Sequence, residues 1–353
     1  MKKIVLTGGG TAGHVTPHFA LIPRLKENGW DIHYIGTADG IERELMAEQL
    51  PYYPISAGKL RRYFDLKNLS DPFRVLKGVF QAYQILRKLR PRVVFSKGGF
   101  VSVPVTMAAW LLRIPVVLHE SDLTPGLANK ISLPFARELC LTFPDSLRYL
   151  KGRGVVTGTP IRAELTRGSK SQGLRLCKFS EGTPTLLVMG GSLGARILNQ
   201  TIRDNLDILT KDYQIIHLCG QGNLDPKSIN PRYYQIEYAK EDLPHLLAAA
   251  DLVLSRAGAN SIFELLALAK PHILVPLSKQ ASRGDQILNA ESFARQGFSL
   301  VIEEEGFTLE SLQRSLRELY ARREEFSETM GSSKVKDGTE NVLRVIEQHA
   351  RRK

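Results

Sequence analysis

The sequence predicts an α/β protein that consists of two similar, doubly wound domains. Three observations support this prediction: the length, an alternation of short apolar runs with longer amphipathic stretches, and a repetition of motifs. The chain has 353 residues, which is more than one hydrophobic core usually organises. The alternation is typical of βα units, in which helices connect parallel strands.

Eight apolar runs have the length of β-strands, and we expect a turn and a helical pattern after each of them. The expected strands are Lys3 to Thr7, Asp31 to Ile35, Val93 to Ser96, Val116 to His119, Leu186 to Met189, Gln214 to Cys219, Leu252 to Ser255 and His272 to Pro276. No apolar stretch approaches the roughly 20 residues that cross a bilayer. We therefore expect no transmembrane helix, and the early glycines argue against a signal peptide.

Two motifs of the first half return in the second half. LTGGGTAGH, at residues 6–14, has the layout of VMGGSLGAR, at residues 188–196. VFSKGGFVS, at residues 94–102, similarly corresponds to VLSRAGANS, at residues 253–261. Such self-similarity predicts that the two domains share one architecture.

The boundary between the domains is expected at Thr157 to Arg162, where glycine and proline interrupt the chain. The first domain then covers residues 1–162, and the second domain covers residues 163–337. Residues 338–353 contain a helical pattern, which we expect to pack back on the first domain.

The composition is that of a soluble globular protein, with 43% hydrophobic and 24% charged residues. The three cysteines, Cys140, Cys177 and Cys219, form no CxxC pair, which favours a reducing, cytoplasmic setting. A net charge of +12 indicates an anionic partner: nucleic acid, a lipid surface or a phosphorylated substrate. Nucleic acid is disfavoured because the chain lacks zinc-finger spacing and RNA-binding aromatic motifs.

Gly8, Gly10 and Gly13 follow the first expected strand and lead into a helical pattern. Glycines let the backbone approach an oxygen-rich ligand, and free amides at a helix start attract anions. Tight turns also use glycine for steric reasons, so both interpretations stay open. The GxGxxG spacing fits a dinucleotide site. However, the second strand ends at Gly36 and Thr37 without an acid for the ribose, which argues against a dehydrogenase.

The second glycine loop, Gly190 to Gly194, repeats this arrangement and adds the hydroxyl of Ser192. His14 lies just past the first loop, whereas Ala195 stands at the equivalent place in the second. Because an imidazole titrates near neutral pH, His14 is a candidate general base for a sugar hydroxyl. The alternative is a histidine at a helix start that only binds phosphate or packs.

Ser261 and Glu264 have two interpretations. Their SxxE spacing fits a capping box, in which the glutamate accepts from an amide at the helix start, and the local sequence favours it. Alternatively, the carboxylate accepts from two hydroxyls of a ribose. Further on, the amides of Gln286 and Asn289 suit sugar hydroxyls, although solvated loop residues have the same pattern.

No Asp-x-Asp pair and no close cluster of metal-ligating side chains occurs, so we expect neither a metal ion nor a cofactor. A departing nucleotide diphosphate then needs helix N-termini and arginine to take up its charge. The loop with Ser192 and the side chain of Arg162 are the candidates for this role.

Aromatic and cationic residues mix at near-helical spacing in residues 60–67 and 72–83. A surface helix that touches anionic lipid has this pattern. An ordinary amphipathic helix whose apolar stripe faces the core has it too.

Seven motifs resemble the peptidoglycan glycosyltransferases of family 28, in order and across nearly the whole chain. They are GGGTAGH, SKGGFVS, HESDLTPGLANK, GTPIR, GGSLGARILNQ, SRAGANSIFE and DQILNA. The resemblance implies a GT-B fold, with two Rossmann-like domains that flank a cleft. It also implies inverting transfer of N-acetylglucosamine from UDP-N-acetylglucosamine (UDP-GlcNAc) to undecaprenyl-pyrophosphoryl-N-acetylmuramyl-pentapeptide (lipid I). The C4 hydroxyl of lipid I would be the acceptor, and the product would be lipid II.

The resemblance implies roles for single residues as well. Thr11, Ala12 and Gly13 would contact the sugar-phosphate region, and Arg162 and Ser192 would bind the donor diphosphate. Glu264 would bind the ribose, together with Asn260 and Ser261 of the same motif. Gln286 would bind the N-acetylglucosamine hydroxyls. The assignment of Glu264 reverses the local preference for a cap. His14 and Glu120 are the candidate acid and base.

Two positions depart from the family pattern. Many members carry a tyrosine where Phe100 stands, and an asparagine at a donor-binding position where Asp122 stands. The carboxylate of Asp122 cannot supply an amide donor.

The resemblance places the protein at the cytoplasmic side of the cell membrane, as a peripheral protein. The net charge of +12 fits an anionic membrane surface and a polyprenyl-linked substrate. Other cell-wall synthesis proteins would be further partners. The alternatives are another GT-B transferase acting on a glycolipid and a catalytically silent module that binds a UDP-sugar.

Overall fold

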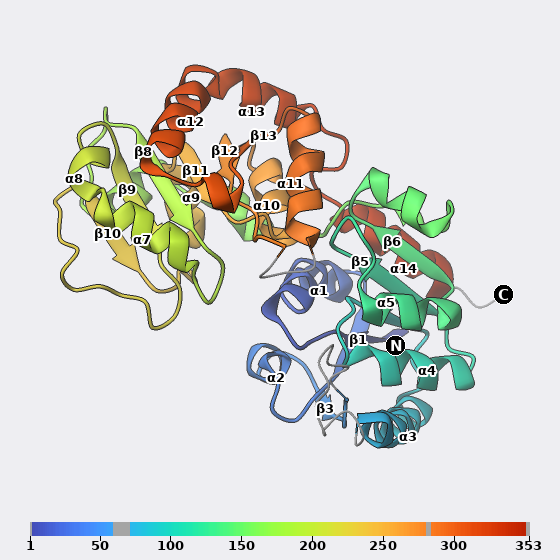
Figure 1. The fold of residues 1–353 in the computed structure, drawn as a ribbon. Coiled ribbons are helices and arrows are strands. Elements are labelled where there is room, and N and C mark those ends of the chain that lie inside the picture. Colours follow the sequence, from blue (N-terminus) through green and yellow to red (C-terminus); the bar gives the residue numbers. More distant parts are fainter. Residues whose placement is uncertain (1, 59–70, 280–283, 351–353) are drawn as a thin grey trace. The chain divides into compact units, whose positions relative to one another are not determined.

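The structure is a computed structural model that describes residues 2–58, 71–279 and 284–350 (Figure 1). The chain forms two compact units. The first consists of Met1–Pro160 together with Asp337–Lys353, and the second is Ile161–Lys336.

The first unit is built on a seven-stranded sheet in the order β3-β2-β1-β4-β5-β6-β7, in which all neighbours are parallel. Its strands are β1 (Lys2–Thr7), β2 (Trp30–Gly36), β3 (Tyr52–Pro54), β4 (Val93–Ser96), β5 (Val116–Glu120), β6 (Glu138–Leu141) and β7 (Val155–Val156). The strand order reverses between β1 and β4. Ligands of doubly wound sheets bind at such a switch point, beyond the carboxyl ends of the strands.

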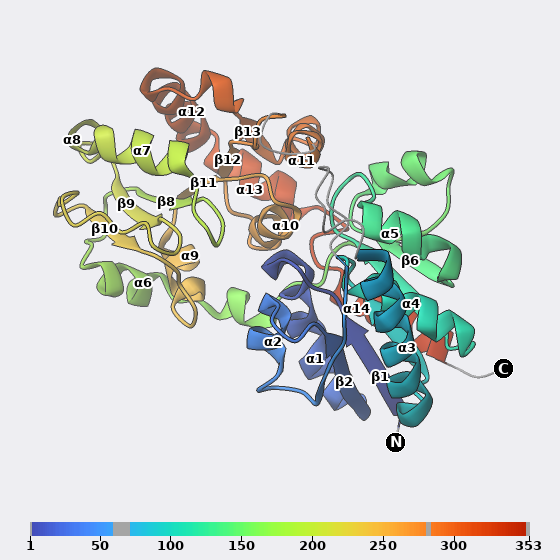
Figure 2. The ribbon, with the colours of Figure 1, turned by 60° about the horizontal axis from the view of Figure 1, so that its bottom comes forward.

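Helices cover both faces of this sheet, because successive residues of a strand point to opposite sides. Leu6 of β1 shares one core with Leu21 of the first helix and Ile346 of the last, whereas Val5 shares the other core with Leu86. The helices are α1 (Pro17–Glu27), α2 (Ile41–Met46), α3 (Asp71–Leu89), α4 (Ser102–Leu111), α5 (Leu127–Ser132) and α14 (Thr339–Ala350), with the 3-10 helices η1 (Ala12–His14), η3 (Leu133–Phe135) and η4 (Pro144–Leu150). Although α14 is at the end of the sequence, it lies among the elements of the first unit (Figures 1 and 2).

The second unit repeats this design with a six-stranded parallel sheet in the order β10-β9-β8-β11-β12-β13. Its strands are β8 (Thr185–Met189), β9 (Gln214–Leu218), β10 (Tyr233–Ile236), β11 (Leu252–Ser255), β12 (His272–Leu274) and β13 (Ser299–Val301). The helices are η5 (Ala163–Arg167), α6 (Lys170–Cys177), α7 (Arg196–Asp204), α8 (Leu206–Leu209), α9 (Leu243–Ala249), α10 (Ala259–Ala267), α11 (Asp285–Arg295), η6 (Glu304–Gly306), α12 (Leu309–Ala321) and α13 (Arg323–Gly331). The switch point lies between β8 and β11, which confirms the predicted repetition of one architecture.

All eight predicted strands are present, with ends that differ by two residues or fewer. The expected helix after β9 is wrong, because residues 219–232 form turns that lead into β10. Gly220, Gly222, Pro226 and Pro231 disfavour a helix there. The strands that were not predicted, β3, β6, β7, β10 and β13, have only two to four residues each.

Candidate functional site

The loop after β1 is held by a carboxylate of the protein itself. Glu42, from α2, is fully buried. Its Oε2 accepts a hydrogen bond from the Gly10 amide at 3.1 Å, and its Oε1 accepts from the amide and the hydroxyl of Thr37. A side chain on Gly9 would collide with this carboxylate. An internal anion therefore already occupies the Gly10 amide, which lies just before the N-cap of η1, Thr11.

His14 lies in η1, and not at the start of α1, which begins at Pro17. Its Nδ1 is 3.0 Å from the hydroxyl oxygen of Thr11. Thr11 is exposed, while Ala12, Gly13 and His14 are half-buried. The four candidates thus form one short segment that follows the glycine loop and that solvent can reach.

The loop after β4 packs directly against the loop after β1. Gly99 has a φ of +79°, and a side chain there would collide with the carbonyl oxygen of Gly9. Only glycine allows this approach of two backbones. Because β1, β4 and β5 are adjacent parallel strands, the segment with His14 after β1 and Glu120 at the end of β5 lie at the same edge of the sheet, where the carboxyl ends of the strands meet.

Glu120 ends β5 and is buried, and both of its oxygens accept hydrogen bonds. Oε1 accepts from the Asp122 amide at 3.2 Å, and Oε2 accepts from the Gly126 amide at 2.8 Å and from Nδ2 of Asn129 at 2.9 Å. Burial and the charge of Asp122 raise the pKa of Glu120 to about 6, although these hydrogen bonds lower it. In this structure Glu120 holds the turn of residues 121–126.

The equivalent loop of the second unit, after β8, differs in its anion-binding capacity. Ser192 and Leu193 are exposed, and the residue that caps α7 is Ala195, whose methyl group cannot accept a hydrogen bond. Among the described residues, no side chain caps this helix. Amides in the first turn of such a helix attract an anion.

Ser261 and Glu264 do not form a capping box. The N-cap of α10 is Gly258, so Ser261 itself occupies the third helical position and Glu264 lies a turn too far along. Instead, Oε1 of Glu264 accepts from Nε and Nη2 of Arg162 at 3.3 and 3.0 Å. Burial raises the pKa of Glu264, and the charge of Arg162 opposes this rise. Its Oε2 has no partner in the part of the chain that the structure describes.

The remaining candidates of the second unit lie at the same sheet edge. Asn260 and Ser261 are half-buried in the first turn of α10, which follows β11. Gln286 is half-buried in the first turn of α11, and its Oε1 accepts from the Leu277 amide at 3.1 Å. Because β8, β11 and β12 are neighbours, their following loops bring Ser192 and these three residues to one edge.

Two buried charged residues at the edge of the first sheet were not predicted. Glu42 follows β2 by six residues, in the segment where an acid for a ribose was sought and not found. Lys97 follows β4 within the repeated SKGG motif, and it is 1% exposed. In residues 2–58, 71–279 and 284–350, no group of three or more His, Cys, Asp or Glu side chains is arranged to hold a metal ion.

Both units match domains of one enzyme family. Residues 4–140 match the glycosyltransferase family 28 N-terminal domain, and residues 185–342 match the glycosyltransferase family 28 C-terminal domain. The chain belongs to glycosyltransferase family 28. The resemblance inferred from the seven motifs is thus confirmed.

Relatives in family 28 are similar over almost their whole length. One from Clostridium tetani is 55% identical over 351 residues, which are 99% of this chain and 98% of the relative. One from Clostridium novyi is 55% identical over 98% of each chain. Both are named UDP-N-acetylglucosamine--N-acetylmuramyl-(pentapeptide) pyrophosphoryl-undecaprenol N-acetylglucosamine transferase.

Two solved structures are similar to the chain over almost its whole length. The crystal structure of Acinetobacter baumannii MurG has a TM-score of 0.77 at 25% identity, over 99% of this chain and 100% of that chain. UDP-GlcNAc 2-epimerase from Neisseria meningitidis, at 13% identity and a TM-score of 0.66 over 99% of each chain, shares the fold alone. The predicted GT-B fold is confirmed.

Proposed function

We infer that this protein transfers N-acetylglucosamine from UDP-GlcNAc to lipid I and so forms lipid II for peptidoglycan synthesis. Two relatives named for this activity are 55% identical to the chain, over 99% and 98% of it. Domains of one glycosyltransferase family match both units. The protein is therefore a hexosyltransferase, as the motifs predict.

The second unit is proposed to bind the donor, with the diphosphate at the loop of Ser192. The observation that carries this proposal is the contrast between the two glycine loops. Glu42 occupies the Gly10 amide in the first loop, whereas Ala195 leaves the first turn of α7 without a side-chain acceptor. An anion gains from such preorganised amides both when it binds and as charge develops on the leaving group.

Glu264 is proposed to hold the ribose, and Arg162 the diphosphate. Arg162 is the counterion of Glu264, and both side chains are about one-fifth exposed, at 20% and 18%. Oε2 of Glu264 remains able to accept from a ribose hydroxyl. Asn260, Ser261 and Gln286 at the same edge would bind further hydroxyls of the donor.

The first unit is proposed to receive the acceptor, with His14 as the general base for its C4 hydroxyl. Contact with the Thr11 hydroxyl orients the imidazole ring of His14. Thr11, Ala12 and Gly13 would line the substrate beside it. Glu120 is less suited to proton transfer, since three donors from its own turn already engage its carboxylate.

A peripheral position at the cytoplasmic side of the membrane is proposed from the exposed face of α3. Phe73, Leu76 and Phe80 share this face and are 74%, 63% and 62% exposed, with Arg74 and Lys77 between them. An apolar stripe flanked by cations suits an anionic lipid surface. Residues 60–67, the other part of the predicted basic face, lie outside the described residues. Among the described residues, no helix is both long and apolar enough to cross a membrane.

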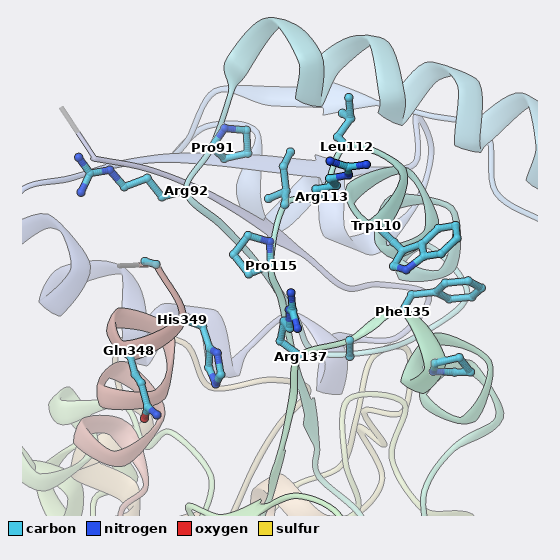
Figure 3. Close-up of a pocket in the computed structure, with 14 residues that line it drawn as sticks. Pro91, Arg92, Trp110, Leu112, Arg113, Pro115, Phe135, Arg137, Gln348 and His349 are labelled. Atoms are coloured by element: carbon cyan, nitrogen blue, oxygen red, sulfur yellow. The ribbon is translucent and has the colours of Figure 1, made fainter. Parts of the chain in front are cut away.

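A basic cavity elsewhere on the same unit is a second surface that suits anionic headgroups (Figure 3). Its volume is about 1220 Å³, and its lining contains Arg92, Arg113 and Arg137 but no acidic residue. None of the three guanidinium groups has an ion-pair partner among the described residues. In Figure 3, Trp110 and Phe135 lie side by side near Arg137, with ring centroids 5.5 Å apart. Trp110 is exposed and Phe135 is half-buried, and cations beside such aromatic rings suit a surface at the lipid headgroups.

The activity is tested with purified protein, UDP-GlcNAc and a lipid I analogue. We expect release of UDP and formation of a disaccharide-lipid product without added metal. Donor binding without any turnover would contradict the transferase and leave a module that binds a UDP-sugar. An acceptor panel that includes diacylglycerol distinguishes transfer to lipid I from transfer to another glycolipid precursor.

The donor site is tested with Glu264→Gln. Loss of a hydrogen bond to a charged group removes about 1.5–3 kcal/mol, so the KM for UDP-GlcNAc should rise about 10- to 100-fold. Glu241→Gln, at an exposed position of the same unit, is the control and should leave the KM unchanged. An unchanged KM in Glu264→Gln would remove Glu264 from the donor site.

A further inference from the structure

The proposed diphosphate loop of the second unit is held by the loop that follows the neighbouring strand, β9. The Gln221 amide donates to the carbonyl oxygen of Ser192 at 3.1 Å, and Nδ2 of Asn223 donates to that of Leu193 at 3.1 Å. Ser192 and Leu193 are exposed, so contacts of their backbone, and not burial of their side chains, set the shape of this loop. The shape of residues 190–194 therefore depends on residues 219–223.

Two glycines allow the two loops to pack backbone against backbone. Gly194 has a φ of +75°, and a Cβ atom there would lie 2.1 Å from the carbonyl oxygen of Cys219. Gly220 has a φ of +88°, and a Cβ atom there would lie 2.1 Å from the amide nitrogen of Gly194. Only glycine tolerates both the positive φ and the close approach. A displacement of Cys219 would thus be passed directly to Gly194.

Helix α7 holds both ends of the loop of residues 219–223. Nδ2 of Asn199 donates to the carbonyl oxygen of Cys219 at 2.8 Å. One turn further along α7, Nη2 of Arg203 donates to the carbonyl oxygen of Asn223. The buried amide of Asn199 can hold Cys219 only while Nδ2, and not Oδ1, faces that carbonyl. The orientation of this amide therefore decides the position of Cys219.

His217, which lies on β9 and is fully buried, sets the orientation of the Asn199 amide. Its Nε2 lies 3.0 Å from Oδ1 of Asn199, and its Nδ1 lies 2.8 Å from the hydroxyl oxygen of Tyr233. Burial and the charge of Arg203 lower the pKa of His217 to about 3, so the ring carries one proton. Because the Cys219 carbonyl can only accept, Oδ1 of Asn199 must accept from His217, and Nε2 must carry that proton. Nδ1 then accepts from Tyr233.

These side chains form one directed chain of hydrogen bonds, from Tyr233 through His217 and Asn199 to Cys219. Every nitrogen and oxygen atom of the three side chains has a partner in this chain. Apolar side chains would fill the same space without the cost of burying polar groups. A buried polar network that is fully satisfied fixes one arrangement of its members. The arrangement fixed here ends at the carbonyl against which Gly194 packs.

We propose that His217 is a positioning residue for the donor diphosphate: it fixes the loop of residues 219–223 through Asn199 and so holds the loop of residues 190–194 in its binding shape. The proposal rests on the proposed binding of the diphosphate at Ser192. As a fully buried side chain, His217 acts only through these loops and makes no contact with the donor.

Two matched substitutions of His217 test the proposal. A glutamine amide reaches the position of Nε2 and can still donate to Asn199, whereas an asparagine amide reaches only the position of Nδ1. In His217→Asn the affinity for UDP should fall at least about 10-fold, the effect of losing one hydrogen bond to a charged group. In His217→Gln the affinity should stay within about 3-fold of the unmodified protein, since the donor to Asn199 is kept. Equal losses in the two variants would contradict the role of Nε2.

Uridine, which lacks the diphosphate, separates a positioning role from a general loss of structure. Its affinity for each variant should stay within about 2-fold of that for the unmodified protein, because the change is confined to the loop that binds the diphosphate. Calorimetry with UDP and with uridine measures both affinities. The same loss for uridine as for UDP, or an unchanged affinity for UDP in His217→Asn, would overturn the proposal.

His272→Asn is the matched control. His272 is equally buried in the same unit, but it starts β12, and its Nδ1 lies 2.7 Å from the carbonyl oxygen of Lys270. This variant should leave both affinities unchanged. If thermal melting shows that His217→Asn does not fold, Asn199→Leu breaks the same chain at its next link and should show the same selective loss for UDP. A parallel loss for uridine in Asn199→Leu would also overturn the proposal.

A failure of this proposal is distinguishable from a failure of the proposed function. If the unmodified protein binds UDP but does not turn over the lipid I analogue, the transferase fails and the role of His217 stands. If it turns over and His217→Asn keeps its affinity for UDP, only the role of His217 fails. If the unmodified protein binds UDP no more tightly than uridine, the diphosphate site at Ser192 fails, and the role of His217 fails with it.

Discussion

Glu42 and Ala195 mark the residue-level difference between two loops that the fold makes equivalent. Doubly wound domains normally leave the amides of the first loop to a phosphate-bearing ligand. Here Glu42 accepts from Gly10 and from Thr37, so the loop after β1 is fixed before any substrate binds. The fixed loop also fixes the start of the segment that carries His14, which follows the loop. In the second unit, no side-chain hydrogen bond caps α7, and we propose that the amides of its first turn bind the diphosphate.

We expect Glu42→Ala to destabilise the first unit and to slow turnover. The substitution leaves the Gly10 and Thr37 amides without an acceptor, and each such loss costs about 1–3 kcal/mol. The free energy of unfolding should therefore fall by about 3 kcal/mol, and kcat should fall more than about 10-fold. Glu42→Gln keeps an acceptor oxygen and should lose less. Urea denaturation and UDP release measure the two effects.

Glu44→Gln is the matched control for this prediction, because Glu44 lies on the same helix and is exposed. It should unfold like the unmodified protein. Equal unfolding of Glu42→Ala and the control would show that the carboxylate does not hold the loop.

Single residues also show where sequence reasoning reached its limit. The glycine loops and Glu264 were recognised because they stand in motifs. The partner of Glu264 was not, because Arg162 is 102 residues away in the sequence. The local SxxE pattern favoured a cap, and it failed because α10 starts at Gly258, earlier than the pattern implied. Glu42 and Lys97 were missed because they are buried by segments distant in sequence.

At the scale of whole elements, the longer strands were predictable because helices bury them on both faces and their residues are almost all apolar. The short strands β7 and β13 were not, since two or three residues carry no periodicity. For α3 the sequence left a core-facing and a lipid-facing stripe as alternatives. The helix has a stripe that faces the core, with Ala82 and Leu86 buried, and a second apolar stripe that is exposed, with Phe73 and Phe80; contact of the exposed stripe with lipid stays a prediction.

The exposed stripe of α3 predicts membrane binding that is separable from folding. We expect the triple variant Phe73→Ser/Leu76→Ser/Phe80→Ser to bind vesicles that contain anionic lipid at least about 10-fold more weakly, because it loses three apolar side chains that would enter the lipid surface. Its thermal stability should change little, since these side chains are already 74%, 63% and 62% exposed. Co-sedimentation with vesicles measures the binding.

The control for the stripe is Ile229→Ser in the second unit, at a position that is 85% exposed. It should bind vesicles like the unmodified protein. Equal loss in the control and the triple variant would indicate general surface hydrophobicity and would contradict a specific lipid-facing helix. Vesicles of neutral lipid should bind more weakly, because the cations beside the stripe then lack a partner.

At the scale of the whole molecule, both units share one topology, and both bury histidines whose pKa values are lowered by the burial. Burial lowers the pKa of His18 and of His217 to about 3, and that of His272 to about 4. The pKa of His119 is also held well below its usual value. Nε2 of His18 and of His272 is buried without a partner among the described residues, so neither site can accommodate a second proton. Each unit thus contains two histidines that protonate only on unfolding.

Acid should therefore destabilise both units. Below pH 6.5 the unfolded chain binds protons at four histidines that the folded chain leaves neutral, so stability falls as the pH drops toward 4. Glu120 and Glu264 act in the opposite direction, because their raised pKa values make the folded state bind protons first. The four histidines outnumber these two carboxylates, so the free energy of unfolding should fall as the pH drops, by about 1.4 kcal/mol per pH unit for each net proton taken up on unfolding. Urea denaturation at several pH values measures this slope. In His272→Leu one proton fewer is taken up on unfolding, so this slope should become smaller by about 1.4 kcal/mol per pH unit. An unchanged slope would show that His272 does not contribute to the acid sensitivity.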